Sequence, residues 1–416
     1  MSKKRITFDS VVVLLLALTA FVLMRPYFVW QSYGQPLFAL LPQATLLVSS
    51  FVTFAFLYST SKKIENNMFS VIILFISVWL YRGTIGTDNV SLLSVGYYFF
   101  LFLVIGYLCL DIQMKARVFN VFSVVFALSL VSGIVIWFLL NIGVNLPFTL
   151  LLGDHEGKIR LGAYYRKYFG AAFLYSKFSQ FVRLSAVYDE PGVVGTFAAL
   201  FLIADDFRFK KLKNVVIAIG GVLSLSLAFF LLTSIAASIR SIRKGSLVFA
   251  GVFSLIVVSY FVFMNFETNN PAIGWLQNRL SLDDSGFTGD NRTSESFDYE
   301  FSAFLKDDIR KVIFGNGSRA AVSNYRMSGS FSYKMIIYDF GIFGFVLLLV
   351  WLVIAGIKTS GISWRIVVLI VALLLSIYQR PNVFSIPYIV LLIGGCANLR
   401  YSEDCGALTR SRAADV

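Results

Sequence analysis

Cationic and tyrosine side chains are interleaved in one polar stretch of the chain, residues 153–190. Guanidinium groups bind phosphate through paired hydrogen bonds, and flat aromatic rings can stack on sugar faces. The stretch therefore suits a ligand with phosphate at one end and sugar at the other. The alternative is a membrane-interface belt, where tyrosine and arginine also gather. The side chains concerned are Arg160, Tyr164, Tyr165, Arg166, Lys167, Tyr168, Tyr175, Lys177 and Arg183.

Two acidic pairs, Asp283-Asp284 and Asp307-Asp308, raise the question of a divalent metal ion. Adjacent acids on an exposed loop are usually solvated, so we predict no metal and no cofactor. The three cysteines lie in apolar runs or in the polar tail and form no disulfide or metal-ligand pattern. The single histidine, His155, argues against a histidine-rich metal centre.

The composition indicates what kind of secondary structure carries these side chains. Of 416 residues, 57% are hydrophobic and 14% are charged, and the mean hydropathy is +0.76. A membrane-spanning helix needs ~20 apolar residues, so the chain could supply about a dozen. This excludes a soluble enzyme, a disordered chain and a disulfide scaffold. The net charge of +13 is explained by lysine and arginine retained in the cytoplasm, so we expect no nucleic-acid partner.

The order of apolar runs and basic connectors predicts the direction of each span. The chain opens with Lys3, Lys4 and Arg5 before an apolar run, which indicates an uncleaved first helix with its start inside. The two long polar stretches, residues 141–190 and 265–330, should both lie outside. This requires an even number of membrane crossings between them. This holds if residues 214–239 are two short helices that turn near Leu225–Thr233. We therefore predict an all-α polytopic membrane protein with about 12 transmembrane helices and both termini inside.

The predicted organisation has six parts. Residues 1–140 hold transmembrane helices 1–5, and residues 141–190 form a first periplasmic loop. Residues 191–264 hold helices 6–9, including the short hairpin, and residues 265–330 form the second loop. Residues 331–399 hold helices 10–12, and residues 400–416 form a cytoplasmic tail.

A first motif, RLSAVYDEPGVVGTF, covers residues 183–197 at the end of the first loop. Pro191 can occupy the first turn of a helix, which leaves the helix N-terminus open towards the outer face. Asp189 and Glu190 then lie where the helix dipole favours the ionised carboxylate. Gly195 allows a ligand or a neighbouring helix to approach the backbone.

A second motif spans the end of the second loop and the next apolar run. It begins at Arg292 and continues with phenylalanines at the spacing of a short helix. It then passes through Gly315-Asn316-Gly317 and reaches Asp339, Gly341 and Gly344.

Together these two motifs resemble the signature of bacterial O-antigen polymerases of the Wzy type, which are related to O-antigen ligases. The resemblance implies a glycosyltransferase of the bacterial inner membrane with its active site facing the periplasm. Such an enzyme joins undecaprenyl-pyrophosphate-linked oligosaccharide repeat units into a surface polysaccharide. Donor and acceptor would both be lipid-linked, membrane lipids would surround the chain, and a chain-length regulator protein is a further partner to consider.

The implied reaction assigns roles to particular residues. Arg183 is the first candidate to bind the donor pyrophosphate and Arg292 the second, with Arg160, Arg166, Arg319 and Arg380 in support. Glu190 would orient or accept the proton of the acceptor hydroxyl, and Asp189 is the alternative. Arg183, Glu190, Arg292 and Asp189 thus form the predicted catalytic set. The predicted substrate-binding residues are Tyr164, Tyr165, Tyr168 and Gly195, with Arg160, Arg166, Arg319 and Arg380.

Two alternatives stay open. Ligases carry a histidine at the position of Ser330, and a serine cannot act as the same base, which favours a polymerase over a ligase. A flippase for the same lipid-linked sugar should hold its charged residues at the membrane midplane, whereas here they collect in the two loops. Arg380 and Arg82, in short outer connectors, are either interfacial side chains or ligand contacts.

Overall fold

The computed structural model describes residues 7–30, 40–60, 66–85, 95–151, 163–176, 182–244, 295–318, 320–321 and 332–414, with isolated short pieces between 265 and 287. Statements below concern these residues. The apolar run 246–264, predicted as a span, lies outside them, as do Arg160, His155, Arg292, Arg319 and Ser330.

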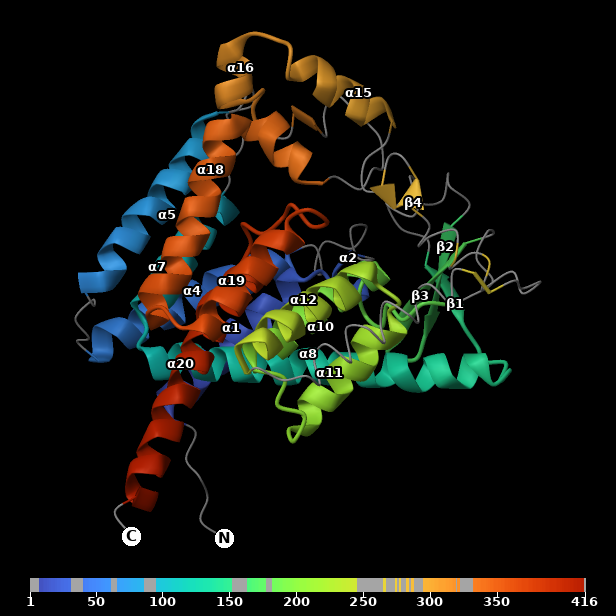
Figure 1. The fold of residues 1–416 in the computed structure, drawn as a ribbon, viewed down its shortest axis with the longest axis horizontal. Helices are drawn as coiled ribbons and strands as arrows, with labels where there is room; N and C mark the ends of the chain where they lie inside the picture. Colours follow the sequence, from blue (N-terminus) through green and yellow to red (C-terminus); the bar gives the residue numbers. More distant parts are fainter. Residues whose placement is uncertain are drawn as a thin grey trace.

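Helices dominate the described chain (Figure 1). The first half holds α1 (Phe8–Leu23), α2 (Tyr27–Trp30), α4 (Leu41–Thr60), α5 (Asn66–Thr84), α7 (Val95–Cys109) and α8 (Ile112–Asn141). The second half holds α10 (Pro191–Ala204), α11 (Leu212–Leu223), α12 (Leu227–Lys244), α15 (Glu295–Phe304), α16 (Ile309–Phe314), α18 (Tyr333–Ser360), α19 (Trp364–Ser376) and α20 (Ile386–Ala414).

Three of the described helices, α4, α8 and α18, are long and apolar enough to cross a membrane. Several shorter apolar helices accompany them, among them α1, α10, α11 and α19. The chain is therefore a helical membrane protein, as the composition predicts.

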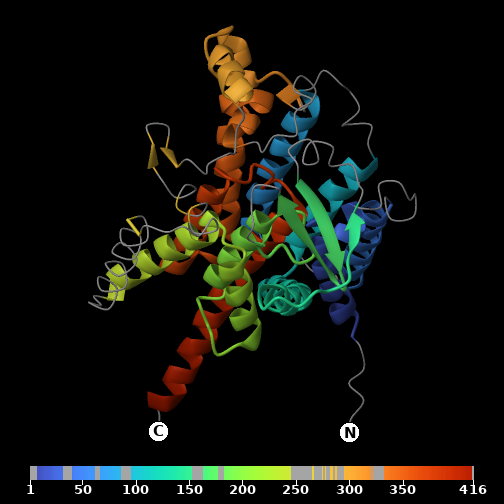
Figure 2. The ribbon, with the colours of Figure 1, turned by 90° about the vertical axis from the view of Figure 1, so that its right-hand side faces the viewer.

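The prediction of an all-α chain needs a correction, because the first polar loop contains a sheet. Strands β1 (Thr149–Leu151), β2 (Ala163–Tyr168) and β3 (Ala171–Ser176) pair antiparallel in the order β1-β2-β3. Strands β2 and β3 join through a tight turn at Phe169 and Gly170, where Gly170 has a φ of 73°. The sheet lies against the C-terminal half of α8 (Figure 2). A further two-stranded pair, β4 (Leu282–Asp283) and β5 (Gly286–Phe287), lies in the second loop.

Residues 214–239, predicted as two short helices, do form two helices, α11 and α12. They meet at the turn Ser224–Ser226, where Leu225 has a φ of 45°. Both pack against α10, which is buried along almost its whole length. A helix that is apolar on every face belongs in the interior, and α10 packs Phe197 and Phe201 against Phe126 of α8.

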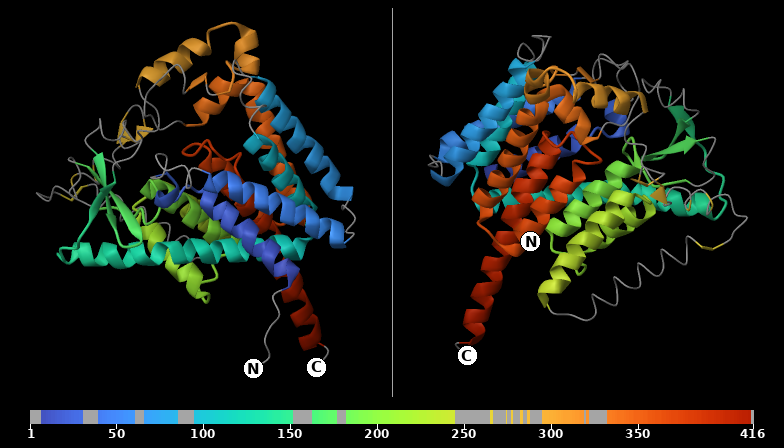
Figure 3. Two further views of the ribbon diagram at one scale, coloured as in Figure 1. Left: turned by 180° about the vertical axis from the view of Figure 1, so that it is seen from behind. Right: turned by 45° about the horizontal axis from the view of Figure 1, so that its top comes forward.

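Parts of three basic connectors predicted to lie inside, 111–117, 205–213 and 240–245, meet at one end of the molecule. The start of α1 and the end of α20 both lie there (Figures 1 and 3). Asp9 of α1 pairs with Arg117 of α8, and Asp206, just after α10, pairs with Arg240 near the end of α12. Figure 3 also shows α1 and α4 side by side across α8 when the molecule is seen from behind.

The second loop contributes α15 and α16, which pack on the start of α18 (Figure 1). The phenylalanines predicted at helical spacing lie on α15, where Phe297, Phe301 and Phe304 are buried around Tyr338. α18 changes direction at Gly341, which has a φ of 69° and a ψ of 176°. α20 continues beyond residue 399 to Ala414, so most of the predicted tail is helical.

Candidate functional site

The site forms where α10 begins. Glu190 is the N-cap residue of α10 in an extended conformation, and Pro191 occupies the first turn. The Glu190 carboxylate makes no capping bond to the helix. It instead accepts a hydrogen bond from Arg380, with 2.7 Å between Nη2 and Oε2. Arg380 comes from the connector between α19 and α20, so an ion pair joins segments 190 residues apart in the sequence.

Arg380 keeps unused hydrogen-bonding capacity beside this pair. Its side chain is 19% exposed, and its Nε is buried with no hydrogen-bond partner in the described structure. The same is true of the hydroxyl of Tyr388, which packs against Phe197 of α10. Burial alone would lower the pKa of Arg380, but the charges of Glu190 and Asp189 raise it above its ordinary value. The guanidinium therefore stays charged and retains an N–H for a further acceptor.

The three-stranded sheet is tied to this site through Asp189. The hydroxyl of Tyr165 donates to the backbone oxygen of Asp189 at 2.7 Å. Tyr165 is only 4% exposed, because it packs with Leu151 and Ala172 beneath the sheet. Its ring offers no open face to a sugar, so the predicted stacking role is replaced by a structural one.

The opposite face of β2 gathers the predicted cation and aromatic side chains, since alternate residues of a strand share a face. The Arg166 guanidinium lies 4.3 Å from the ring centre of Phe148 and 4.4 Å from that of Tyr175. Its Nη2 donates to the hydroxyl of Tyr164 at 3.0 Å, and Tyr164 stacks on Tyr175. Tyr168 is 4% exposed and shares a hydrogen bond with Tyr175. Of the three predicted stacking tyrosines, only Tyr164 is not buried.

Arg183 has a structural partner that the sequence does not reveal. Its Nε donates to the carbonyl of Ser224 and its Nη2 to that of Leu225, each at 3.0 Å. The carbonyls at the end of a helix lack hydrogen-bond donors within the helix. At the end of α11, Arg183 is the donor to two such carbonyls. The guanidinium thus holds the turn between α11 and α12.

Gly195 packs against the same turn from the other side. A Cβ on Gly195 would lie 2.2 Å from Cβ of Ser226. Gly195 was predicted to let either a ligand or a neighbouring helix approach the backbone. In the structure, a neighbouring segment of the chain approaches it. Arg183 and Gly195 together fix the turn Ser224–Ser226 beside the start of α10.

The second motif folds back so that its two halves meet through backbone hydrogen bonds, and these contacts form a backbone joint. The amide of Asn316 donates to the carbonyl of Tyr338, and that of Gly317 to the carbonyl of Asp339. The Tyr81 hydroxyl donates to the carbonyl of Phe340 at 2.9 Å. The glycines of this motif therefore serve close backbone contact rather than ligand contact.

Arg82 lies beside this joint, at the end of α5. Its guanidinium carbon lies 4.2 Å from the ring centre of Phe340 and 5.0 Å from that of Phe384. Phe384 belongs to the same connector as Arg380. Arg82 and Arg380, both predicted to lie in short outer connectors, therefore come together at the connector between α19 and α20. Arg380 belongs to that connector, and Arg82 packs against it from the end of α5.

The described acidic groups do not form a metal centre. No group of three potential ligands occurs among the described residues. Asp307 accepts a hydrogen bond from Lys311, and Asp308 caps α16 by accepting from the amide of Arg310.

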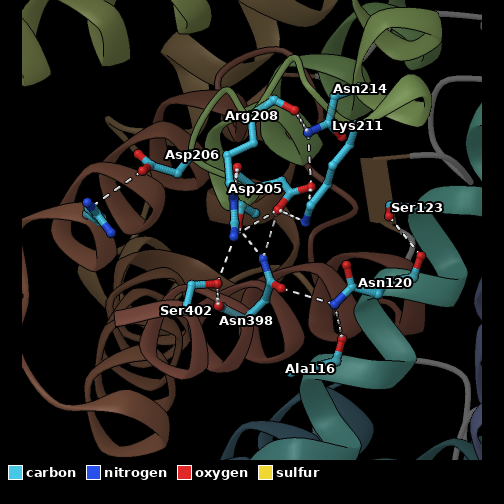
Figure 4. Close-up of polar contacts among 12 residues, drawn as sticks. Ala116, Asn120, Ser123, Asp205, Asp206, Arg208, Lys211, Asn214, Asn398 and Ser402 are labelled. Carbon is cyan, nitrogen blue, oxygen red and sulfur yellow. Dashed lines mark hydrogen bonds and ion pairs between the residues drawn. The ribbon is translucent and has the colours of Figure 1, made fainter. Parts of the chain in front are cut away.

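A second polar cluster, which the sequence analysis missed, lies at the opposite end of α10 (Figure 4). Asp205 is 1% exposed and pairs with Arg208, Lys211 and Lys213. Asn214 and Asn398 also donate to its carboxylate. Burial alone would raise the pKa of Asp205, but the hydrogen bond from Lys211 and the charge of Lys213 lower it below its ordinary value. The one available signal was a pair of adjacent acids among four cations in the connector 205–213.

Comparison with known proteins returned no matching family model, no matching curated protein and no matching solved structure. The fold and the two polar clusters thus define the class, a helical membrane protein with charged groups gathered at both ends of its central helix α10.

Proposed function

We propose that the chain is a glycosyltransferase of the O-antigen polymerase type, which joins undecaprenyl-pyrophosphate-linked repeat units into a surface polysaccharide. The observation that carries this proposal is the Glu190–Arg380 pair at the start of α10. It places a carboxylate and a partly buried cation together, and Tyr165 ties the arginine-bearing sheet to the same segment.

The reaction needs a base and an anion site, and these residues can supply both. Glu190 accepts the proton of the acceptor hydroxyl as its oxygen bonds to the anomeric carbon of the donor. The bond from that carbon to the pyrophosphate oxygen breaks, and the lipid pyrophosphate leaves with the electron pair. Arg380, whose side chain is 19% exposed, stabilises the charge on the leaving group. Arg166 and Tyr164 lie on the face of β2 opposite Tyr165, so their proposed contacts are with parts of the glycan away from the reacting atoms.

The role proposed for Arg183 changes from binding the pyrophosphate to positioning the start of α10. Its two bonds to the turn Ser224–Ser226 make it a positioning residue for the start of α10, and Arg380 becomes the first candidate for the pyrophosphate. Arg292, Arg160 and Arg319 stay predictions, because they lie outside the described residues.

The proposal includes twelve crossings in the bacterial inner membrane with the Glu190 end facing the periplasm. The turn Ser224–Ser226 contacts Arg183 and Gly195 at one end of α10, and Lys213 and Arg240 contact Asp205 and Asp206 at the other. α11 and α12 therefore run between the same two ends as α10, which supports the even number of crossings. The basic connectors at the second end favour the cytoplasm.

The charge distribution supports surface chemistry over transport. The described charged clusters lie at the two ends of α10, at Arg380 and at Asp205, rather than midway along it. A flippase would need polar groups along a central passage.

A polysaccharide gel of a strain lacking the gene tests the proposal. A polymerase deletion leaves a single repeat unit on the normal anchor. Loss of every capped anchor would indicate a ligase instead, and repeat units held on the cytoplasmic face would indicate a flippase. An unchanged ladder of chain lengths would exclude all three.

A further inference from the structure

A cavity of about 340 Å³ lies at the Asp205 end of the molecule, between the ends of α10 and α12 and the start of α19. Small-molecule sites typically begin at ~300 Å³, so a compact polar group fits. The lining residues are Ile203, Asp206, Phe207, Ala236, Arg240, Trp364, Arg365, Val368 and Glu403.

The lining is amphiphilic. Ile203, Ala236 and Val368 form an apolar part, and two arginines and two carboxylates form a charged part. Figure 4 shows Asp206 turned away from Asp205, so the adjacent acids serve different surroundings. Asp205 is enclosed by its cations, whereas Asp206 is 15% exposed and borders the cavity.

The two arginines of the cavity differ in how they are held. Arg240 is fixed by Asp206, with 2.8 Å between Nη1 and Oδ1. Arg365 lies between Asp206 and Glu403 at 3.5 Å and 3.6 Å, and it donates a hydrogen bond to neither carboxylate in the described structure. The Arg365 guanidinium is thus attracted by two carboxylates without donating a hydrogen bond to either one. Its N–H groups are therefore available to an anion.

The charged lining of the cavity is balanced, with two arginines and two carboxylates, and the cationic excess lies in the neighbouring Asp205 cluster. Among the described residues of this end, Asp205, Asp206 and Glu403 face five cations that pair with them. The cations are Arg208, Lys211, Lys213, Arg240 and Arg365.

The position of the cavity indicates where the anion comes from. Trp364 begins α19 and is 42% exposed, and tryptophan at a helix end marks the membrane interface. Basic pockets between membrane helices at this level bind lipid headgroups. The apolar part of the lining would contact the glycerol and upper acyl chains.

We propose that the cavity is a phospholipid site, in which Arg365 and Arg240 bind the headgroup phosphodiester. The site lies at the opposite end of α10 from Glu190 and Arg380, so it is independent of the proposed function. A lipid bound there bridges α12 and α19 through Arg240 and Arg365.

Native mass spectrometry of the full chain in detergent tests this proposal. The probes are phosphatidylglycerol, phosphatidylethanolamine and diacylglycerol with identical acyl chains. We expect both phospholipids to be retained and diacylglycerol to be lost. Arg365→Gln should weaken phospholipid retention about five-fold, the effect of one basic group near a lipid headgroup.

Two further variants keep the test decisive. Arg365→Lys keeps the charge and should retain part of the binding. Arg117→Gln removes an arginine at the same end of the molecule that pairs with Asp9 outside the cavity, and it should bind as the wild type does. Preference for phosphatidylglycerol identifies net charge as the determinant, and equal retention of both phospholipids identifies the phosphodiester alone. Equal retention of diacylglycerol, or unchanged binding by Arg365→Gln, overturns the proposal.

Discussion

Gly315 and Gly341 lie back to back where the second motif closes. A Cβ on Gly315 would lie 2.5 Å from the amide nitrogen of Gly341, and a Cβ on Gly341 would lie 2.6 Å from that of Gly315. Both residues have positive φ angles, 87° and 69°. Two segments 26 positions apart therefore approach through backbone alone, and this approach joins α16 to the bend in α18.

Gly315→Ala should consequently lower the stability of the protein. Left-handed backbone strain costs about 1–3 kcal/mol for a residue other than glycine, and here backbone atoms must also move. The apparent melting temperature of the purified protein, followed by tryptophan fluorescence, measures the loss. Gly361→Ala is the matched control, because Gly361 has a φ of 76° but open space where its Cβ would lie. Equal losses for the two variants would show that the close contact contributes nothing.

Glu190→Gln should abolish detectable polymer. The substitution removes the proposed base and the negative charge that pairs with Arg380 at 2.7 Å, and loss of one preorganised charge typically costs ~10²–10³ in rate. Polymer on a polysaccharide gel and protein in the membrane fraction are measured together. Asp307→Asn, at an exposed carboxylate on the second loop, should leave the polymer unchanged. A normal ladder from Glu190→Gln would remove Glu190 from the mechanism.

Arg183→Ala should also abolish polymer while the protein still inserts and accumulates. It leaves the carbonyls of Ser224 and Leu225 without their donor, at a cost of about 1–3 kcal/mol for such groups when buried. Gly195→Ala disturbs the same turn from the other side without changing charge. Loss of polymer in both variants indicates that Arg183 acts through the turn. Loss in Arg183→Ala alone indicates direct contact with the substrate, and wild-type chain lengths in Arg183→Ala would exclude any role.

Asp205 should make stability depend on acid pH. The pKa of its carboxyl is lower in the folded protein than in the unfolded chain, so its contribution is complete above the unfolded pKa of ~3.9. That contribution is lost as the pH falls through the folded pKa. The melting temperature should therefore drop below about pH 4.

Asp205→Asn is the variant that isolates this effect. At neutral pH it leaves three cations without their shared carboxylate, and breaking a buried ion pair costs about 3–5 kcal/mol. The gap between variant and wild type should narrow in acid. Asp9→Asn, at an exposed pair with 3.8 Å between the charged groups, should show a much smaller gap. A gap for Asp205→Asn that is constant from neutral to acid pH would contradict the prediction.

Much of the helical framework could be predicted because it depends on local composition. Apolar runs of span length, the proline after Glu190 and the phenylalanines of α15 each encode an element within a few neighbouring residues. The sheet was missed because the tyrosines and cations of residues 163–176 were interpreted as ligand chemistry, although tyrosine and phenylalanine also favour strands.

The candidate site could be predicted only in part. The segment Asp189–Pro191 was recognised from local signals, but its partner Arg380 lies 190 positions away and no local pattern links them. Arg183 was predicted to contact the substrate because a sequence cannot show that two backbone carbonyls already bind its guanidinium.

The amino-acid sequence by itself determined that this is a helical membrane protein, where most helices run, and that residues 214–239 break into two. The first two follow from how much apolar surface each segment carries, and the third from the even number of crossings needed between two outer loops. Only the tertiary structure decided which of the distant charges meet, because Glu190 pairs with Arg380, 190 positions away, and Asp206 pairs with Arg240, 34 positions away. Packing around α10 brings those residues together, and packing depends on the shapes of all its neighbours at once.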